Sequence, residues 1–378
     1  MKIASRIADI PMSGIRKMLD LAGSDSVNLG LGEPDLAPPA EAIRGMNEAA
    51  SSGKNKYGPT AGIPELRNAV AEYFSKYGRI EGSNVMITPS GSTGLLEVTQ
   101  SMIDPGDRAI VPDPGFVIYK PHAELAGAEA VGYKLTDDGL FQPDIDDIQS
   151  KITPNTSMIV VNTPSNPTGG VLTEESKRAL CDIARDKGIT ILSDEVYSEF
   201  IYEGKHTSIA SFPGMFDNTI IVSGLSKTYA MTGWRLGWAI APEPMIKDLN
   251  KLQSHSISCC VSFVQEAAVE ALTGPQDAKD SMVREFRKRR DLALDLIDEI
   301  PGLECNVPKG AFYVFPKYDV DMPSAKLAEI LLKEGHVAVT PGTAFGPGGE
   351  GFFRVSYATS EDLIREGFDR IKKTLSQL

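Results

Sequence analysis

The sequence predicts an α/β fold whose large domain has a mostly parallel central sheet covered by helices on both faces. Two observations predict this fold. Short apolar runs alternate with segments of helical periodicity through the middle of the chain, as expected where parallel strands are joined by helices. At 378 residues the chain also exceeds one ordinary hydrophobic core. We therefore expect a second, smaller α+β domain, built from the N-terminal arm and the C-terminal part.

The alternating pattern changes near residue 275, where a long charged helix through Arg284–Arg290 begins and only short strand-like pieces follow. Glu285 interrupts the basic run, so we expect a solvent-exposed helix face and no nucleic-acid patch. Three parts are expected in chain order: an N-terminal arm with part of the small domain over residues 1–40, a large domain over 41–275 and a small domain over 276–378.

Two segments show how helices are specified. The first helix is expected over 64–78, because proline occupies a first-turn position and Gly78 provides a stop. Its apolar residues recur at helical spacing, at Leu66, Val70, Phe74 and Tyr77. The second is expected to begin after Thr173 and to end at Gly188. Such helices would form the scaffold for the strand ends.

Three apolar runs are predicted to be buried strands, at 157–161, 189–193 and 219–222. Each is followed by polar or reactive residues. In open α/β sheets, ligands bind beyond the carboxyl ends of the strands. We therefore expect the residues that follow the runs to meet in one crevice: Asn166, Asp194, Tyr197 and Lys227.

Lys227 follows a buried strand and a turn of small residues, with Arg235 eight positions later. A partly desolvated lysine has a lowered pKa and a neutral fraction able to attack an aldehyde, whereas an arginine can bind a phosphate. On Lys227 alone, a solvated surface lysine is an equally good interpretation.

A second segment that could bind a phosphate is expected near residue 90. Residues 84–88 are predicted to form a strand, 90–94 a tight turn and 95–103 a helix, whose N-terminal amides would face an anion. The expected cradle is Gly91, Ser92 and Thr93. Small residues are common in any loop, so this signal is weak alone.

Other interpretations of the single motifs were weighed. Asp194-Glu195 after an apolar strand also suits a nucleotide-hydrolase metal site, but no Gly-x-x-x-x-Gly-Lys-Ser/Thr motif occurs in the chain. Phe116 suits the core, Asn166 before proline suits a turn, and Arg354 suits an exposed strand. Whether each of these residues is functional or merely structural depends on whether the motifs occur together in one chain.

Six blocks, in order along the chain, resemble the class I/II aminotransferases, which are pyridoxal-phosphate enzymes of fold type I. They are residues 28–35, 57–67, 162–170, 193–197, 223–238 and 353–357. The resemblance implies that Lys227 forms a Schiff base with pyridoxal 5'-phosphate and serves as general acid and base. It further implies that Asp194 keeps the pyridine nitrogen protonated, that Tyr197 and Asn166 bond the phenolic oxygen, and that Phe116 stacks on the ring.

The resemblance also implies the remaining contacts. The cofactor phosphate would be bound by Gly91, Ser92, Thr93, Ser226 and Arg235, and by Tyr57 of the neighbouring subunit, which implies a homodimer. The substrate carboxylate would be bound by Arg354, Gly32 and Asn166. The segment 306–316 is expected to pack beside the site without taking part in chemistry. Gly224 departs from the pattern, since many relatives have a serine there; Ser223 or Ser226 could compensate.

The implied activity is transfer of an amino group from an L-amino acid to a 2-oxo acid, by family habit 2-oxoglutarate, with ping-pong kinetics. A pyridoxal-phosphate lyase or synthase on the same fold is the alternative. A ligand-sensing regulator would need an added DNA-binding region, for which the short N-terminal arm leaves no room. Some aspartate-type relatives have a lysine where this chain has Ser92, so preference for a dicarboxylate stays open.

Composition sets broad limits. A formal net charge of −13 opposes binding to nucleic acid. The four cysteines form neither a disulfide framework nor a metal pattern and are expected to be buried small hydrophobic residues. No apolar run approaches the ~20 residues that span a bilayer, and charges near the N-terminus leave no signal-peptide core. A cytoplasmic enzyme without a metal or a membrane anchor is expected.

Overall fold

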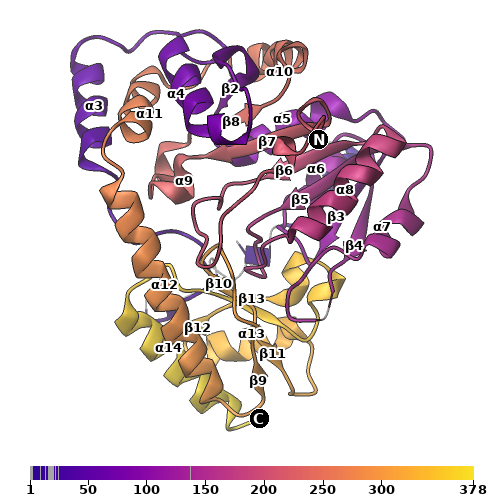
Figure 1. Cartoon of the computed structure of the whole chain (residues 1–378). Helices are drawn as coiled ribbons and strands as arrows, with labels where there is room; N and C mark the ends of the chain where they lie inside the picture. Colours follow the sequence, from indigo (N-terminus) through magenta and orange to yellow (C-terminus); the bar gives the residue numbers. More distant parts are fainter. Residues whose placement is uncertain are drawn as a thin grey trace.

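The computed structural model describes residues 3–8, 10–12, 14–15, 21, 23, 25–136 and 138–378. Its centre is a seven-stranded sheet with the strand order β2-β8-β7-β6-β5-β3-β4 (Figure 1). The strands are β2 (Val85–Thr88), β3 (Arg108–Asp113), β4 (Glu129–Lys134), β5 (Thr156–Asn162), β6 (Thr190–Asp194), β7 (Thr219–Gly224) and β8 (Gly237–Ile240). Only β8 runs antiparallel to its neighbours, so the predicted mostly parallel sheet is confirmed.

Helices cover both faces of this sheet, as alternate residues of its strands show. On β6, Ile191 packs in a core with Leu180 of α8, whereas the next residue, Leu192, packs in a core with Leu95 of α5. The helices of this part are α3 (Ala40–Ser51), α4 (Pro64–Phe74), α5 (Gly91–Met102), α6 (Tyr119–Leu125), α7 (Ile145–Lys151), α8 (Glu174–Lys187), α9 (Leu225–Thr228), α10 (Glu243–Ser256) and α11 (Ser262–Thr273).

The two helices predicted from the sequence over 64–78 and 173–188 are confirmed. Helix α4 has proline in its first turn, and its residues Leu66, Val70 and Phe74 are buried. A 3-10 turn with the buried Tyr77 follows, and Gly78 has φ 148°. Helix α8 begins after Thr173, whose side chain accepts a hydrogen bond from the amide of Ser176. It ends at Gly188, which adopts the left-handed conformation with φ 66°.

The smaller part combines both ends of the chain. Strand β1 (Val27–Asn28) pairs in parallel with β12 (Val337–Ala338), and Val27 and Leu29 share a core with residues of the C-terminal elements. The other elements are β9 (Leu303–Glu304), β10 (Tyr313–Val314), β11 (Lys317–Tyr318), β13 (Thr340–Pro341), β14 (Phe353–Ser356), α12 (Asp277–Asp298), α13 (Ser324–Lys333) and α14 (Glu361–Leu375). Recruitment of an N-terminal strand agrees with the expectation. The domain boundaries at residues 40 and 275 stay predictions, and several residues of the arm lie outside the described part.

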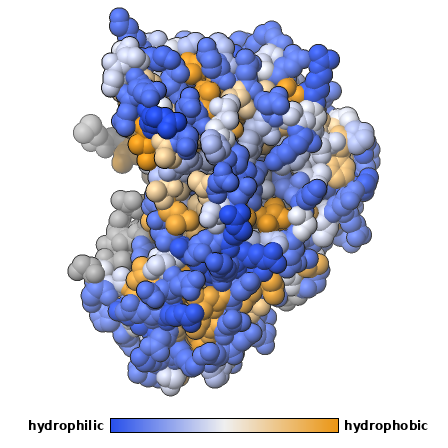
Figure 2. Space-filling model, turned by 60° about the vertical axis from the view of Figure 1, so that its left-hand side comes forward, coloured by the Kyte–Doolittle hydropathy of each residue, from blue (hydrophilic) through white to orange (hydrophobic). Residues whose placement is uncertain are grey.

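Short helices complete the described elements. Helix α1 spans Ser5–Ala8, and 3-10 helices span Ser75–Tyr77, Gly82–Asn84, Ile209–Ser211, Phe216–Asn218, Thr232–Trp234, Gly342–Phe345 and Pro347–Gly349. Along the described ranges, no helix has both the length and the apolarity needed to cross a bilayer. Figure 2 shows that one face of the molecule is largely hydrophilic, with apolar residues gathered in patches.

The expectation of a solvated basic face on α12 is wrong at two positions. Arg289 and Arg290 are each only 5% exposed. Arg289 donates to Oδ1 of Asp35 at 2.7 Å and to Oε1 of Glu285 at 3.1 Å. Arg290 donates to the carbonyl of Pro308 at 3.1 Å. The helix runs from the large part into the smaller part (Figure 1), so other segments cover this face.

The cysteines are only partly as expected. Cys181 and Cys260 are buried, but Cys259 and Cys305 are half-buried. All four are free thiols. Among the described residues, no group of three or more histidine, cysteine, aspartate or glutamate side chains could hold a metal ion.

Candidate active site

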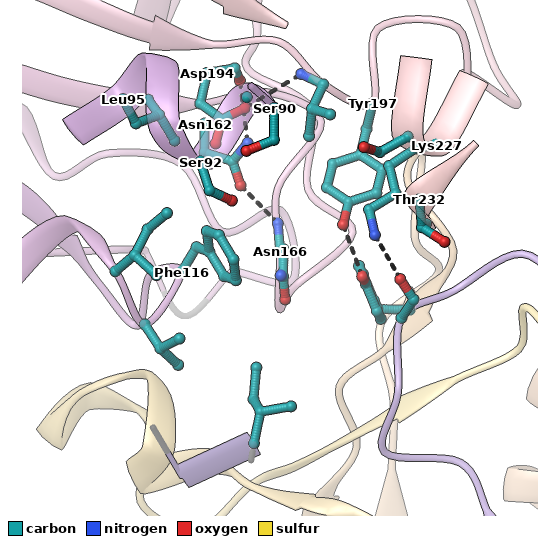
Figure 3. Close-up of a pocket in the computed structure, with 18 of the residues that line it drawn as sticks. Ser90, Ser92, Leu95, Phe116, Asn162, Asn166, Asp194, Tyr197, Lys227 and Thr232 are labelled. Carbon is teal, nitrogen blue, oxygen red and sulfur yellow. Dashed lines mark hydrogen bonds between the residues drawn. The ribbon is translucent and has the colours of Figure 1, made fainter. Parts of the chain in front are cut away.

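A cavity of about 370 Å³ lies beyond the carboxyl ends of β5, β6 and β7. Its lining brings together most of the predicted site residues: Gly32, Gly91, Ser92, Phe116, Asn166, Asp194, Tyr197, Ser226, Lys227, Arg235 and Arg354. Figure 3 shows Lys227 and Thr232 on one side of the cavity, Phe116 and Ser92 on the other, and Asn166 between them. Thr93 and Tyr57 are predicted site residues that do not line it.

Asp194 ends β6 and is 3% exposed. Its Oδ2 accepts a hydrogen bond of 2.7 Å from the hydroxyl of Tyr119, and its Oδ1 accepts one of 3.2 Å from the amide of Val196. Burial raises the pKa of Asp194 to about 6, although both hydrogen bonds oppose the shift. Sequence reasoning missed Tyr119, which begins α6 three positions after Phe116.

Lys227 lies in the short helix α9, directly after β7. Its Nζ donates a hydrogen bond of 2.7 Å to the carbonyl of Gly32. Burial lowers the pKa of Lys227 to about 8, against the charge of Glu33, which raises it. The structure therefore excludes a fully solvated surface lysine, and a useful fraction of the amine is neutral near neutral pH.

The N-terminus of α5 forms one wall of the cavity, but the helix starts earlier than predicted. It begins at Gly91 and not at Leu95, because Ser90 caps it: its Oγ accepts a hydrogen bond of 3.2 Å from the amide of Thr93. The hydroxyl of Thr93 donates to the carbonyl of Pro89 at 2.9 Å. Gly91 and Ser92 thus face the cavity, whereas the polar groups of Thr93 serve the helix cap.

Gly224, where the resemblance leads us to expect a serine, has no room for a side chain. It pairs with Gly237 of β8, and a Cβ on Gly224 would lie 2.9 Å from both Cα of Gly237 and the carbonyl oxygen of Leu236. Ser223 donates to the carbonyl of Glu195 at 3.2 Å and is thereby engaged outside the cavity. Of the two serines expected to compensate, only Ser226 lines the cavity.

Two arginines line the same cavity at different depths. Arg235 is exposed, adopts the left-handed conformation with φ 52° and donates to the carbonyl of Thr232 at 2.8 Å. Arg354 is 1% exposed, so the interpretation as an exposed strand arginine is wrong. Its Nη1 donates to Oδ1 of Asn166 at 2.7 Å.

Among the described residues, no carboxylate pairs with the guanidinium of Arg354. It lies over the rings of Tyr313 at 4.4 Å and Phe345 at 5.0 Å, and Nη2 donates to the carbonyl of Gly30. Its buried Nε has no hydrogen-bond partner among the described residues. A buried cation with a free donor suits a ligand carboxylate.

The segment around Tyr313 packs beside the site, as expected, and Tyr313 itself lines the cavity. The hydroxyl of Tyr313 lies 2.7 Å from that of Tyr197. A Cβ on Gly32 would lie 1.9 Å from the Tyr313 hydroxyl, so only glycine fits there. Asn162, which was not predicted as a site residue, accepts from the amide of Asn166 at 2.7 Å and donates to the carbonyl of Asp194 at 3.0 Å.

The remaining wall is apolar. Its residues come from the N-terminal segment and from the loop after β3: Ile15, Leu31, Phe116, Val117 and Ile118. Phe116 is partly buried, packs against one of the cores and meets Tyr119 edge-on at 5.8 Å. It is therefore a core residue on one side and a cavity residue on the other.

Tyr57 lies outside this cavity and is 92% exposed. The loop that carries it is fixed to the body of the protein by side chains of α10 and α11. Gln253 donates to the carbonyl of Thr60, and Gln265 accepts from the amide of Ile63 at 2.9 Å. The exposed phenol thus lies close in sequence to residues that are hydrogen-bonded to α10 and α11.

Comparisons with known proteins agree on one family. The family model described as aminotransferase class I and II matches residues 24–371. An aspartate aminotransferase of Pyrococcus horikoshii is 43% identical over 99% of this chain and 97% of its own length. Aromatic-amino-acid aminotransferase 2 of Thermococcus litoralis is 39% identical over 100% of this chain and 99% of its own. The solved structure of the Thermus thermophilus aspartate aminotransferase with maleate has a TM-score of 0.92 at 35% identity and covers 99% and 100% of the two chains.

Proposed function

Because this chain belongs to the class I and II aminotransferases, we propose that it moves an amino group from an L-amino acid to a 2-oxo acid with pyridoxal 5'-phosphate as cofactor. Transamination itself follows from the family. The observation that carries the assignment of the site is the amine of Lys227. It has a lowered pKa and shares one cavity with a buried carboxylate and with a buried guanidinium whose Nε has no hydrogen-bond partner among the described residues.

The residues present fit the cofactor. Asp194 would hold a protonated pyridine nitrogen, since its buried carboxylate has no cation partner among the described residues. Tyr197 and Asn166 would bond the phenolic oxygen, and Phe116 would cover one face of the ring. Gly91, Ser92, Ser226 and Arg235 would bind the phosphate. Thr93 would contribute through the helix cap rather than by contact.

When bound, the cofactor supplies an aldehyde that takes up an amino group and a ring that withdraws electrons from the substrate. The chain supplies the proton transfers. Lys227 Nζ is the one amine in the described cavity lining, and after displacement by the substrate it would move the proton from the substrate Cα. General acid-base transfer of this kind contributes roughly a hundredfold to ten-thousandfold in rate.

Arg354 would orient the substrate by binding its carboxylate, together with the neighbouring Asn166 and Gly32. The free Nε–H and the planar fork of the guanidinium suit an α-carboxylate. One site would serve the donor and the acceptor in turn, so ping-pong kinetics are expected, with 2-oxoglutarate as the acceptor. The apolar wall and the hydroxyl of Ser92 in place of a cation support donors with apolar or aromatic side chains.

The exposed phenol of Tyr57 supports a homodimer. Because it lies outside its own cavity, this side chain would be available to the cofactor phosphate of a second subunit. A cytoplasmic location stays a prediction.

The test is a half-reaction screen. Purified protein loaded with pyridoxal phosphate is mixed with each of the twenty amino acids, and absorbance is followed for conversion to the pyridoxamine form. We expect conversion with aromatic and large apolar donors, and none with the Lys227→Ala variant. A protein that binds the cofactor but produces no 2-oxo acid from any donor would contradict the proposal and favour a lyase or synthase.

A further inference from the structure

The residue that follows Asp194 in the chain, Glu195, carries a buried carboxylate that has no part in the chemistry proposed above. Glu195 is 0% exposed and lines no cavity described here. Three side chains donate to it: Ser208 to Oε1 at 2.6 Å, Ser193 to Oε1 at 2.9 Å and His206 Nε2 to Oε2 at 2.8 Å. Charged groups are rarely buried unless their hydrogen bonds are satisfied, so this set calls for a reason.

The backbone of Glu195 joins two strand ends. Its amide donates to the carbonyl of Val222 on β7 at 2.9 Å. Its carbonyl accepts a hydrogen bond of 3.2 Å from the hydroxyl of Ser223, the next residue of β7. Glu195 follows Asp194, and Ser223 precedes Lys227 by four positions. The residue that holds the carboxylate end of β6 is therefore bonded directly to the strand that delivers the amine.

His206 completes this arrangement from a separate segment. Its side chain is 3% exposed and meets the ring of Tyr77 edge-on at 5.7 Å. Its Nδ1 has no partner among the described residues, whereas its Nε2 lies against Oε2 of Glu195. Lys177 of α8 is also buried and interacts electrostatically with Glu195.

The hydrogen bonds keep Glu195 ionised. Burial alone would raise the pKa of this carboxyl, but His206 and the two serine hydroxyls outweigh burial and lower the pKa below its ordinary value. A carboxylate fixed by three donors has one orientation, which also fixes the backbone on either side of it.

We propose that Glu195 and His206 are positioning residues for the transamination reaction: together they clamp the end of β6 to the end of β7, and so fix the carboxylate of Asp194 relative to the amine of Lys227. The proposal rests on the proposed function, in which a single bound ring must meet both groups. Misplacement of reacting groups by about 1 Å is enough to cost orders of magnitude in rate.

The experiment compares three variants with wild type. His206→Phe keeps the ring contact with Tyr77 but removes the donor; His206→Gln keeps an amide donor at a comparable reach. Ser360→Ala is the control, because it removes the N-cap of the remote helix α14 and lowers stability without touching the site. Each is measured for cofactor dissociation constant, for kcat and KM with an amino acid, and, without cofactor, for hydrogen exchange at the amide of Glu195.

For His206→Phe we expect cofactor affinity and kcat each to fall on the order of tenfold, the equivalent of one lost hydrogen bond to a charged group. KM for the amino acid should change less than about twofold, because Arg354 is untouched. Exchange at the Glu195 amide should accelerate. His206→Gln should restore all of these values, and Ser360→Ala should leave them at wild-type levels.

Two results would overturn the proposal: His206→Phe with unchanged affinity and kcat, or His206→Gln as impaired as His206→Phe. If His206→Phe does not fold, Ser193→Ala takes its place, because it removes one donor to Oε1 with little change in volume; unchanged cofactor affinity there would equally refute the clamp. Hydrogen exchange needs no cofactor, so it tests the clamp even if wild type fails to bind pyridoxal phosphate, a failure that would refute the proposed function alone.

Discussion

The hydroxyl of Tyr119 donates a hydrogen bond of 2.7 Å to Oδ2 of Asp194, and both side chains are almost completely buried. Tyr119 comes from the first turn of α6 and Asp194 from the end of β6. This contact favours the ionised carboxylate, whereas burial disfavours it. The two effects leave Asp194 with a pKa of about 6, so it stays mainly ionised at neutral pH.

Replacing Tyr119 with phenylalanine should disturb this balance. The variant loses a hydrogen bond to the charged form, so the pKa of Asp194 should rise further above about 6. At pH 7 a larger share of the carboxyl is then protonated, and affinity for pyridoxal phosphate should fall by roughly tenfold. Carbon-13 NMR of labelled aspartate in the cofactor-free protein gives the titration. An unchanged titration curve would show that the hydroxyl has no influence on the carboxylate.

Lys227 should make the stability of the cofactor-free protein depend on pH. Its folded pKa of about 8 is lower than the ordinary value of 10.5, so the folded chain binds fewer protons between these values. Its contribution to stability is therefore present above pH 10.5 and is lost as pH falls through 8. Lys227→Met should be more stable than wild type below pH 8, by at most about 3 kcal/mol, and the difference should shrink as pH rises. Urea unfolding at several pH values measures this; a constant difference would refute it.

Arg354→Lys tests recognition of the substrate carboxylate. A lysine has neither the planar fork nor the stacking contact with Tyr313, so kcat/KM for the amino acid should fall by a hundredfold to a thousandfold, equivalent to roughly 3 to 4 kcal/mol. Cofactor affinity should stay at the wild-type value. Arg365→Lys, an exposed position on α14, is the matched control. A loss confined to cofactor affinity would place Arg354 at the phosphate instead.

Gly224→Ser introduces the serine that the resemblance leads us to expect, and should nevertheless destabilise this protein. The new Cβ would lie 2.9 Å from two backbone atoms of the neighbouring strand, so the pair β7–β8 must move. Overpacking of this kind costs roughly 1 to 3 kcal/mol, visible as a lower midpoint of thermal unfolding. Gly233→Ser is the control, since nothing lies within 4 Å of a Cβ there. Tighter cofactor binding without loss of stability would contradict this prediction.

Tyr57→Phe examines the proposed dimer. The phenol lies outside its own cavity and is almost fully exposed, so in an isolated chain its hydroxyl should have no effect on cofactor binding. If a second subunit uses it, the variant should bind pyridoxal phosphate several-fold more weakly while sedimenting with the same mass. Equal affinity in both proteins would remove the main support for a shared site.

The sheet and the meeting of Asn166, Asp194 and Lys227 could be predicted because each depends on local patterns: apolar runs followed by polar residues, in a fold whose ligands bind at strand ends. Tyr119 and Tyr313 could not, because their hydroxyls reach partners 75 and 116 positions away in the sequence. Arg289 and Arg290 were misplaced for a related reason. Charge alone suggests exposure, and nothing local shows that Asp35 and the Pro308 segment cover that face of α12.

Where β7 and β8 meet the start of α5, glycines leave the main chains almost in contact. A Cβ on Gly237 would lie 2.5 Å from the amide nitrogen of Gly91 and 2.8 Å from the carbonyl oxygen of Ser223. The protein beneath the predicted phosphate position is therefore main chain rather than side chain. Main-chain peptide groups have no side-chain rotamers that a bound ligand would have to immobilise. Immobilising side chains on association costs roughly 0.5 to 1.5 kcal/mol each. Here the main chain lost its conformational entropy when the protein folded. An anion that binds at this position therefore meets amides that are already ordered.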